Sequence, residues 1–165
     1  PGLVKGHLFP KLLVEFFLKT KDRRWKEHTL LCDDPLMSYV EGSGKIALYE
    51  ASKPIHTQMP FVVLSEDEVF IYPKEWQLFA GMRRIATRAF LILEKAWQIE
   101  GRTLVDFKVE FGRQRGALML GDDLTPDGCR FWDRTTRENL GKDRGRRSPA
   151  REAAAYREIF RRVCP

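Results

Sequence analysis

Charged side chains alternate with apolar ones between Leu104 and Gly112 of this 165-residue chain. Asp106, Lys108 and Glu110 are expected on one face of a strand, because successive side chains of a strand point to opposite sides. The other face would carry the apolar residues Val105, Phe107, Val109 and Phe111. A half-buried strand explains the apolar face, but it does not explain a charged face that is negative, positive and negative in succession.

A second charged cluster follows between Gly121 and Arg130. Two groups of carboxylates with a lysine between them suit a magnesium–triphosphate complex, because carboxylate oxygens bind the metal and an ammonium group contacts phosphate oxygens. The alternative is a solvated face whose charge pairs contribute about a few tenths of a kcal/mol each. The pattern alone leaves both interpretations open.

A hairpin is expected to connect the two clusters. Glycines at both ends of Gly112–Gly116 are typical of a hairpin loop, and Ala117–Leu120 would be the returning strand. This hairpin would bring Asp122 or Asp123 beside Asp106 and the lysine that follows it. Strict alternation places the second of these acids on the charged face, whereas a bulge at the preceding glycine places the first there. Both arrangements stay open.

Residues 75–100 give the clearest helical pattern. Apolar residues recur there at three- and four-residue steps, and Gly101 stands where a helix commonly ends. We expect this stripe to pack in the core: Phe79, Met82, Ala86, Phe90, Leu93 and Trp97. A second helix is expected from about Ala150 to Val163.

The first half of the chain is less regular. Residues 12–18 are predicted to be a buried strand, and short strands are predicted over residues 45–50, 60–64 and 70–72. Residues 36–72 form the least regular part of the sequence, and the pattern assigns no chemistry to them.

The composition predicts one soluble domain. With 43% hydrophobic and 32% charged residues, the chain has the length and the apolar content for a core. No apolar run approaches the length of a membrane span, and no secretory signal opens the chain. Cys32, Cys129 and Cys164 are far apart and form no CxxC pair. This favours free thiols in a reducing cytoplasm over a structural zinc site.

The net charge of +6 is concentrated at one end of the chain. From Asp133 to Pro165, ten Lys or Arg residues face five Asp or Glu residues. A basic segment of this kind suits nucleic acid or an anionic small molecule. The arginines are mixed with acids, however, so a solvated helix face is the more common explanation, and no nucleic-acid-binding motif is present.

Four blocks of the sequence resemble the phosphoribosylaminoimidazole-succinocarboxamide synthase (SAICAR synthetase) family. They are Leu104–Gly112 (LVDFKVEFG), Leu120–Asp123 (LGDD), Leu124–Asp133 (LTPDGCRFWD) and Lys142–Arg144 (KDR). Their order and spacing make the resemblance specific, and it extends over roughly residues 10–35 and from Trp76 to the end. It implies an α+β fold, an antiparallel sheet with packed helices that is similar to the larger lobe of that family. Residues 1–165 would then be a single domain, with residues 36–72 as an insertion.

The resemblance implies a cytoplasmic, ATP-dependent ligase of purine biosynthesis. ATP would phosphorylate the carboxylate of carboxyaminoimidazole ribotide, and the amine of aspartate would displace the phosphate to give the succinocarboxamide. ATP and Mg²⁺ are the implied cofactors, and the two small molecules are the implied partners. Neither nucleic acid nor a membrane is an expected partner, so the basic third of the chain would bind carboxylates and a phosphate.

The resemblance also assigns roles to individual residues. Asp106 and Lys108 match catalytic positions near the nucleotide phosphates, where the lysine also contacts the nucleotide. Glu110 and Asp122 match the magnesium-binding acids, as hard oxygen ligands for a hard ion. The residues matched to substrate binding are Asp127, Arg130, Lys142, Asp143 and Arg146. Arg130 would grip the ribotide phosphate, because its planar fork of donors suits a phosphate dianion.

One part of the family pattern is not expected in this chain. The family usually opens with a lobe of strands that carries a nucleotide loop containing glycine and lysine, and the segment before Pro10 does not match it. Two alternatives to an active ligase follow. The chain is a non-catalytic relic or ribotide-binding module, or it is one piece of an assembly in which a second copy or a partner supplies the lobe.

Overall fold

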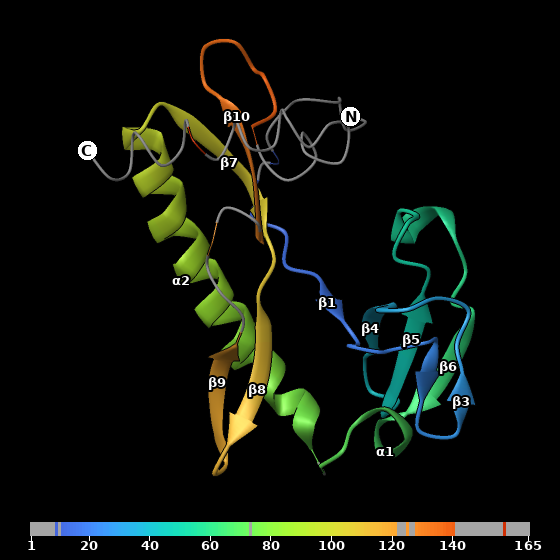
Figure 1. The fold of residues 1–165 in the computed structure, drawn as a ribbon. Coiled ribbons are helices and arrows are strands. Elements are labelled where there is room, and N and C mark those ends of the chain that lie inside the picture. The colour runs from blue at the N-terminus through green and yellow to red at the C-terminus, as the bar shows by residue number, and fades with distance from the viewer. Residues whose placement is uncertain are drawn as a thin grey trace. The chain divides into compact units, whose positions relative to one another are not determined.

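The computed structural model describes residue 9 and residues 11–72, 74–121, 125, 128–140 and 157. The chain divides into two compact units, Pro1–Phe79 and Ala80–Pro165, whose helices and strands are labelled in Figure 1. A single domain with an insertion at residues 36–72 stays a prediction.

The first unit is built on a four-stranded antiparallel sheet in the order β1-β4-β5-β6. These strands are β1 (Phe16–Phe17), β4 (Leu36–Val40), β5 (Lys45–Tyr49) and β6 (Val62–Ser65). The unit also contains a hairpin and short helices: β2 (Arg24–Trp25), β3 (His28–Thr29), η1 (Ile55–Thr57), α1 (Glu66–Val69) and η2 (Glu75–Gln77).

Strand β5 supplies the centre of the core of this unit. Ile46 and Leu48 are fully buried and cluster with Leu64 of β6 and Val69 of α1. The strands predicted at residues 45–50 and 60–64 are confirmed, with small shifts of their ends. The expectation that residues 36–72 are the least regular part of the chain is wrong, because three strands of the sheet lie there.

Two other strand predictions are wrong. Of residues 12–18, only Phe16 and Phe17 pair as a strand, because β1 meets β4 at two positions only, and Leu13 is 65% exposed. No strand forms at residues 70–72, all of which the structure describes. The Glu75 carboxylate accepts hydrogen bonds there from the backbone N–H groups of Ile71 and Tyr72, at 3.1 and 3.3 Å. A sheet would have needed these donors.

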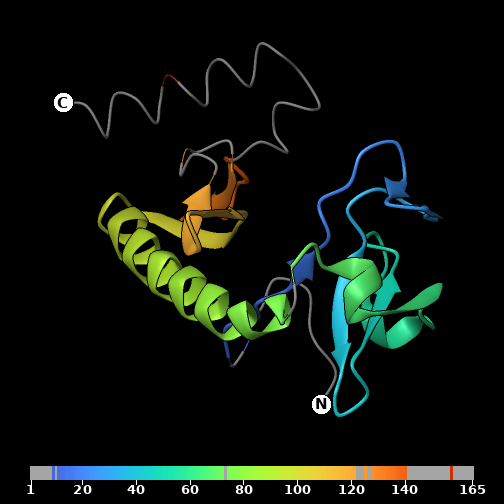
Figure 2. The same cartoon turned by 90° about the horizontal axis from the view of Figure 1, so that it is seen from below.

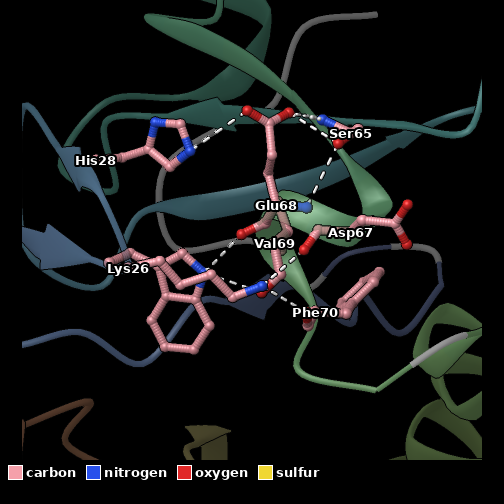
Figure 3. Close-up of polar contacts among 8 residues, drawn as sticks. Lys26, His28, Ser65, Asp67, Glu68, Val69 and Phe70 are labelled. Carbon is pink, nitrogen blue, oxygen red and sulfur yellow. Dashed lines mark hydrogen bonds and ion pairs between the residues drawn. The ribbon is translucent and has the colours of Figure 1, made fainter.

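The β2–β3 hairpin is attached to α1 by side chains that bind its last carbonyl groups (Figure 3). The Trp25 indole N–H donates to the Val69 oxygen at 2.9 Å, and Lys26 Nζ donates to the oxygens of Asp67 and Phe70 at 2.7 and 2.6 Å. Carbonyls at a helix C-terminus have no partner within the helix, so the hairpin satisfies groups that α1 cannot satisfy itself.

A second link between the hairpin and α1 runs through Glu68. Its Oε2 accepts hydrogen bonds from the Ser65 N–H and Oγ, both at 2.8 Å, while its Oε1 lies 3.4 Å from His28 Nε2. Ser65 Oγ accepts the Glu68 N–H in return, which completes a capping box. The two Ser65 contacts, with smaller contributions from the charges of His28 and Lys26, hold the pKa of Glu68 below its ordinary value of 4.5.

We expect Glu68→Gln to destabilise the first unit at neutral pH and to make its stability less dependent on acid. A carboxylate with a lowered pKa in the folded state stabilises fully above its unfolded pKa, and this contribution is lost as the pH falls through the folded pKa. Urea denaturation at neutral pH and at about pH 4 would measure both effects. Glu27→Gln, an exposed change in the turn of the same hairpin, is the matched control. Equal acid sensitivity in both variants would contradict the assignment.

Helix α2 (Leu78–Ile99) confirms the helix predicted over residues 75–100. Of its predicted stripe, Ala86 is buried, and Phe90, Leu93 and Trp97 pack against the core of the second unit. Trp97 stacks on Phe131 with ring centroids 4.7 Å apart, and Phe90 lies 5.9 Å from Phe107. Phe90, Leu93, Trp97 and Phe107 pack against the buried cluster of the second unit, which contains Leu104, Cys129, Phe131 and Leu140.

Two antiparallel ribbons lie along α2 in both views of the molecule (Figures 1 and 2). One pairs β7 (Arg102–Phe107) with β10 (Cys129–Asp133), and the other pairs β8 (Glu110–Gln114) with β9 (Ala117–Gly121). The helix and the second ribbon touch closely, since a Cβ atom on Gly81 would lie 3.5 Å from Leu118 Cδ2.

The predicted hairpin forms, with a shorter loop. Strand β8 continues to Gln114, and the turn consists of Arg115 and Gly116, whose φ angles are 50° and 82°. Two central residues with positive φ are typical of the tight turn that matches strand twist. The returning strand predicted over residues 117–120 is confirmed.

Within the part of the chain that the structure describes, no helix combines the length and the apolarity needed to cross a membrane. The helix predicted from Ala150 to Val163 lies outside the described residues, apart from Arg157.

Candidate functional site

The expected charged strand is divided between two ribbons. Strand β7 ends at Phe107 and β8 begins at Glu110, and the two pair with different partners. Leu104 is 1% exposed, whereas Val105 is only half-buried. The expectation of one strictly alternating strand is therefore wrong, because pairing with β10 imposes a different register on its first half.

A register shift in the β7–β10 ribbon explains the position of Asp106. Arg130 pairs with Asp106, but the next residue, Phe131, pairs with Leu104, so Val105 has no partner in β10. Arg130 and Phe131 point to opposite faces of β10, because they are successive residues of a strand. Because Val105 is an extra residue in β7, the partners Leu104 and Asp106 also point to opposite faces. This extra residue leaves Leu104 in the core with Phe131 and turns Asp106 to the exposed face with Arg130.

Asp106 and Arg130 meet in a two-point ion pair. Arg130 Nε donates to Asp106 Oδ1 at 2.9 Å, and Arg130 Nη2 donates to Asp106 Oδ2. The side chains are 43% and 54% exposed. Exposed ion pairs contribute only about 0–1 kcal/mol to stability, so an anionic ligand can compete for the guanidinium at small cost.

Lys108 and Glu110 form a second exposed ion pair. Lys108 Nζ lies 3.3 Å from Glu110 Oε1, and the side chains are 59% and 38% exposed. The Lys108 backbone is held in place, because its N–H donates to the Gly128 carbonyl oxygen at 2.8 Å. The chain between the two ribbons is therefore tied to the segment that leads into Arg130.

The hairpin brings the start of the second acidic cluster to Glu110. Gly121 lies opposite Glu110 in the β8–β9 register, and Asp122 is the next residue. Among the described residues the hairpin pairing ends at Glu110 and Gly121, and Asp106 pairs with Arg130 of β10. Asp122 and Asp123 lie outside the described residues, so the expectation that the hairpin brings one of them beside Asp106 and Lys108 stays a prediction, as does which of them meets a metal.

Five predicted site residues lie outside the described part of the chain: Asp122, Asp127, Lys142, Asp143 and Arg146. Over the residues that are described, no three His, Cys, Asp or Glu side chains gather closely enough to hold a metal ion. The magnesium pair of Glu110 and Asp122 therefore stays a prediction.

Cys129 directly precedes Arg130 in β10, but its thiol is unreactive at neutral pH. It is 3% exposed and pairs with Phe107 in the ribbon. Burial, with a smaller contribution from the negative charge of Asp106, raises the pKa of the Cys129 thiol to about 11. A thiol with this pKa stays protonated at neutral pH, so Cys129 offers neither a nucleophile nor a metal ligand there.

Arg102 and Asp133 form an ion pair that was not predicted from the sequence. Arg102 Nη1 lies 3.1 Å from Asp133 Oδ2, and the Arg102 side chain is 3% exposed. The two residues are opposite one another at the end of the β7–β10 ribbon. The pattern Asp-Arg-Thr-Thr after β10 is typical of an Asx turn and was the available signal. Nothing local in the sequence indicates that a buried arginine is its partner.

The described site thus presents two exposed ion pairs on neighbouring segments. Carboxylates at Asp106 and Glu110 are oxygen donors of the kind that magnesium prefers, and Lys108 and Arg130 are donors for phosphate oxygens. Such a set can neutralise and position a phosphorylated ligand. It contains no activated side-chain nucleophile.

The second unit and part of the first are similar in sequence to known proteins. A family model described as SAICAR synthetase matches residues 62–163. The phosphoribosylaminoimidazole-succinocarboxamide synthase of Pseudomonas paraeruginosa is 39% identical over 104 residues, which cover 63% of this chain and 44% of the relative. The enzyme of the same name from Desulfitobacterium hafniense is 51% identical over 71 residues, which cover 43% of this chain and 30% of the relative.

Solved structures give the same result. A SAICAR synthetase in complex with ADP has a TM-score of 0.54 and 31% identity, and the SAICAR synthetase of Pyrococcus horikoshii OT3 has a TM-score of 0.53 and 30% identity. Each match covers 72% of this chain and 50% of the solved chain. The chain spans half or less of the length of these relatives. The expected α+β fold of antiparallel strands and packed helices is confirmed.

Proposed function

Because the chain belongs to the SAICAR synthetase family, we propose that it acts in an ATP-dependent ligase of purine biosynthesis. In this proposal it provides residues that bind carboxyaminoimidazole ribotide and the metal–phosphate end of ATP. The ligase joins aspartate to the ribotide carboxylate, which ATP activates by phosphorylation, and gives the succinocarboxamide ribotide, ADP and phosphate.

The Asp106–Arg130 ion pair is the observation that carries this proposal. The register shift in β7 brings both residues to one exposed face, although Asp106 would otherwise share the buried face of Leu104. The planar guanidinium of Arg130 suits the ribotide phosphate, and the carboxylate of Asp106 holds it in a defined orientation. Asp127, Lys142, Asp143 and Arg146 complete the proposed substrate site, as the family resemblance implies.

The nucleotide end of the site rests on Lys108 and Glu110. Lys108 would contact phosphate oxygens, and Glu110 with Asp122 would hold magnesium. The exposed carboxylate of Glu110 suits a hard ion. Gly121, the residue before Asp122, pairs with Glu110 in the β8–β9 ribbon. Magnesium, when bound, neutralises charge on the phosphate oxygens. One solved relative is a complex with ADP, which supports nucleotide binding as part of the proposed function.

A non-catalytic ribotide-binding module is the second candidate function. It would need only the exposed guanidinium of Arg130, which suits the ribotide phosphate. In this case Arg130 would bind the ribotide, and ATP would not be turned over. A second copy or another chain that supplies the nucleotide lobe is the corresponding proposal for the partner.

Calorimetric titration of the chain with MgATP and, separately, with carboxyaminoimidazole ribotide would test the proposal. Binding of both ligands, followed by amide formation with aspartate, is the result expected of a ligase. Binding of the ribotide alone would favour the ribotide-binding module. Absence of binding to both would overturn the proposed function.

Asp122→Asn is expected to abolish magnesium-dependent nucleotide binding and to spare ribotide binding. An amide keeps the shape of the carboxylate but loses the charge that a divalent ion needs. The change is measured by the same two titrations, with and without Mg²⁺. Asp123→Asn is the matched control, and unaltered nucleotide affinity for Asp122→Asn would remove this residue from the metal site.

A further inference from the structure

The four charged side chains described in the candidate site neutralise one another. Asp106 pairs with Arg130, and Glu110 pairs with Lys108, so each positive charge lies against a negative one. A neutral set attracts a polyphosphate anion only weakly, because the field that draws an anion depends on the sum of the nearby charges. A divalent cation that joins the set would make it strongly positive.

The two ion pairs differ in how firmly they are held. Arg130 donates to Asp106 from two nitrogens, and the contact between Nε and Oδ1 is 2.9 Å long. The other pair joins Lys108 Nζ to Glu110 Oε1 at 3.3 Å. A guanidinium fork fixes its geometry on a carboxylate, whereas an ammonium group is a point charge on a flexible chain. The Lys108–Glu110 contact is therefore the one that a ligand breaks more easily.

The backbone on both sides of this contact is fixed. The Lys108 N–H donates to the Gly128 carbonyl oxygen at 2.8 Å. Glu110 pairs with Gly121 in the β8–β9 ribbon, where a Cβ atom on the glycine would lie 3.5 Å from the Glu110 carbonyl oxygen. Only Val109 separates the two charged residues. Both charged side chains are exposed, so they can exchange partners by rotamer changes without movement of the backbone.

Glu110 cannot hold Lys108 and a divalent cation equally well. Its carboxylate is a ligand of the kind that magnesium prefers. An ammonium group on the same carboxylate would repel the ion, because the Coulomb energy rises with the product of the charges and with their nearness. Lys108 would therefore leave Glu110 when the carboxylate binds the ion, and its ammonium group could then meet a phosphate oxygen.

We propose that Glu110 is a specificity-determining residue, which makes the site accept phosphate groups with magnesium and disfavour them without it. Glu110 engages Lys108 until a divalent cation takes the carboxylate, and Lys108 then turns to the phosphate. This inference rests on the proposed function, in which Lys108 contacts the nucleotide phosphates and Glu110 binds magnesium.

Glu110→Gln in the full chain tests the inference by calorimetric titration with MgATP and with ATP in EDTA. Metal-free ATP should bind about three- to fivefold more tightly to this variant, because it no longer competes with an exposed ion pair. MgATP should bind about tenfold more weakly, a usual size for coupling between two ligands. Glu138→Gln removes an exposed carboxylate of the same unit and should leave both affinities unaltered.

A double-mutant cycle with Lys108→Gln separates the exchange of partners from a general loss of negative charge. If Glu110 acts by engaging Lys108, Glu110→Gln raises the affinity for metal-free ATP in the unaltered background and does not raise it in the Lys108→Gln background. An equal rise in both backgrounds, or no rise in either, would overturn the inference.

A second measurement observes Lys108 without any nucleotide. Reductive methylation with ¹³C labels the lysines and keeps their charge, and the Lys108 signal is the one that Lys108→Arg loses. Excess MgCl₂ is expected to shift this signal in the unaltered chain and not in Glu110→Gln. A signal that stays in place in the unaltered chain, or that shifts equally in both proteins, would contradict the exchange.

Failure of the inference differs from failure of the proposed function. If the unaltered chain binds ATP neither with nor without magnesium, the nucleotide part of the proposed function is overturned and the role of Glu110 falls with it. If the unaltered chain binds MgATP and Glu110→Gln leaves the affinity for metal-free ATP unaltered, only the selection by Glu110 is overturned.

Discussion

Replacing Arg130 by alanine is expected to weaken ribotide binding by about 10- to 100-fold. Hydrogen bonds between a guanidinium and a phosphate are charge-assisted, and they are the strongest contact that the described site offers to the ribotide. Nucleotide affinity should change little, because Arg130 is assigned to the ribotide end of the site. Calorimetric titration with each ligand measures the two effects separately.

Two further variants sharpen this test. Arg84→Ala removes the same charge from an exposed position of α2 and should leave ribotide affinity unaltered. Arg130→Lys keeps the charge but loses the planar fork, so an intermediate affinity indicates two-point binding of the phosphate. Ribotide affinity that survives in Arg130→Ala would remove this residue from the phosphate site.

Phe131→Ala is expected to lower the free energy of unfolding of the second unit by about 3–5 kcal/mol. The Phe131 side chain is fully buried, stacks on Trp97 with centroids 4.7 Å apart, and clusters with Leu104 and Leu140. Removal of the ring leaves a cavity under the ribbon that carries the Asp106–Arg130 pair. Urea denaturation, together with amide exchange at Leu104, measures the loss.

Met119→Ala is the matched control for the core substitution. Met119 lies in β9 of the same unit and is 46% exposed, so its truncation should change stability by less than about 0.5 kcal/mol. Similar losses in the two variants would contradict the assignment of Phe131 to the centre of this core. Ribotide binding by Phe131→Ala at unaltered affinity would show that the ribbon tolerates the cavity.

Features encoded by local patterns could be predicted from the sequence. The apolar steps from Phe79 to Trp97 determined a helix and its buried face, because helical periodicity is a property of neighbouring residues. Glycines 112 and 116 located the hairpin, although not the length of its loop. The sequence blocks around Asp106 and Arg130 were sufficient to identify the family, whose model matches residues 62–163.

The regularity of the first unit was not predictable from the same signals. Strand β4 (Leu36–Val40) was missed because its sequence does not alternate between apolar and polar residues. It is held in the sheet by pairing with β1 on one side and with β5 on the other. The strand predicted near Ile71 failed because a carboxylate four residues later accepts its backbone N–H group. Both outcomes depend on contacts that a short window of sequence does not contain.

The residue types of the candidate site were determined by the sequence, whereas their pairing was decided by the tertiary structure. The nearness of Lys108 and Glu110 follows from two residues of separation, but Asp106 and Arg130 are 24 residues apart. Their meeting depends on pairing of β7 with β10 and on the unpaired Val105, which turns Asp106 away from the core. The Asx-turn pattern at Asp133 did not indicate its pairing with Arg102, 31 residues away, because only the finished ribbon buries the arginine and places its partner opposite.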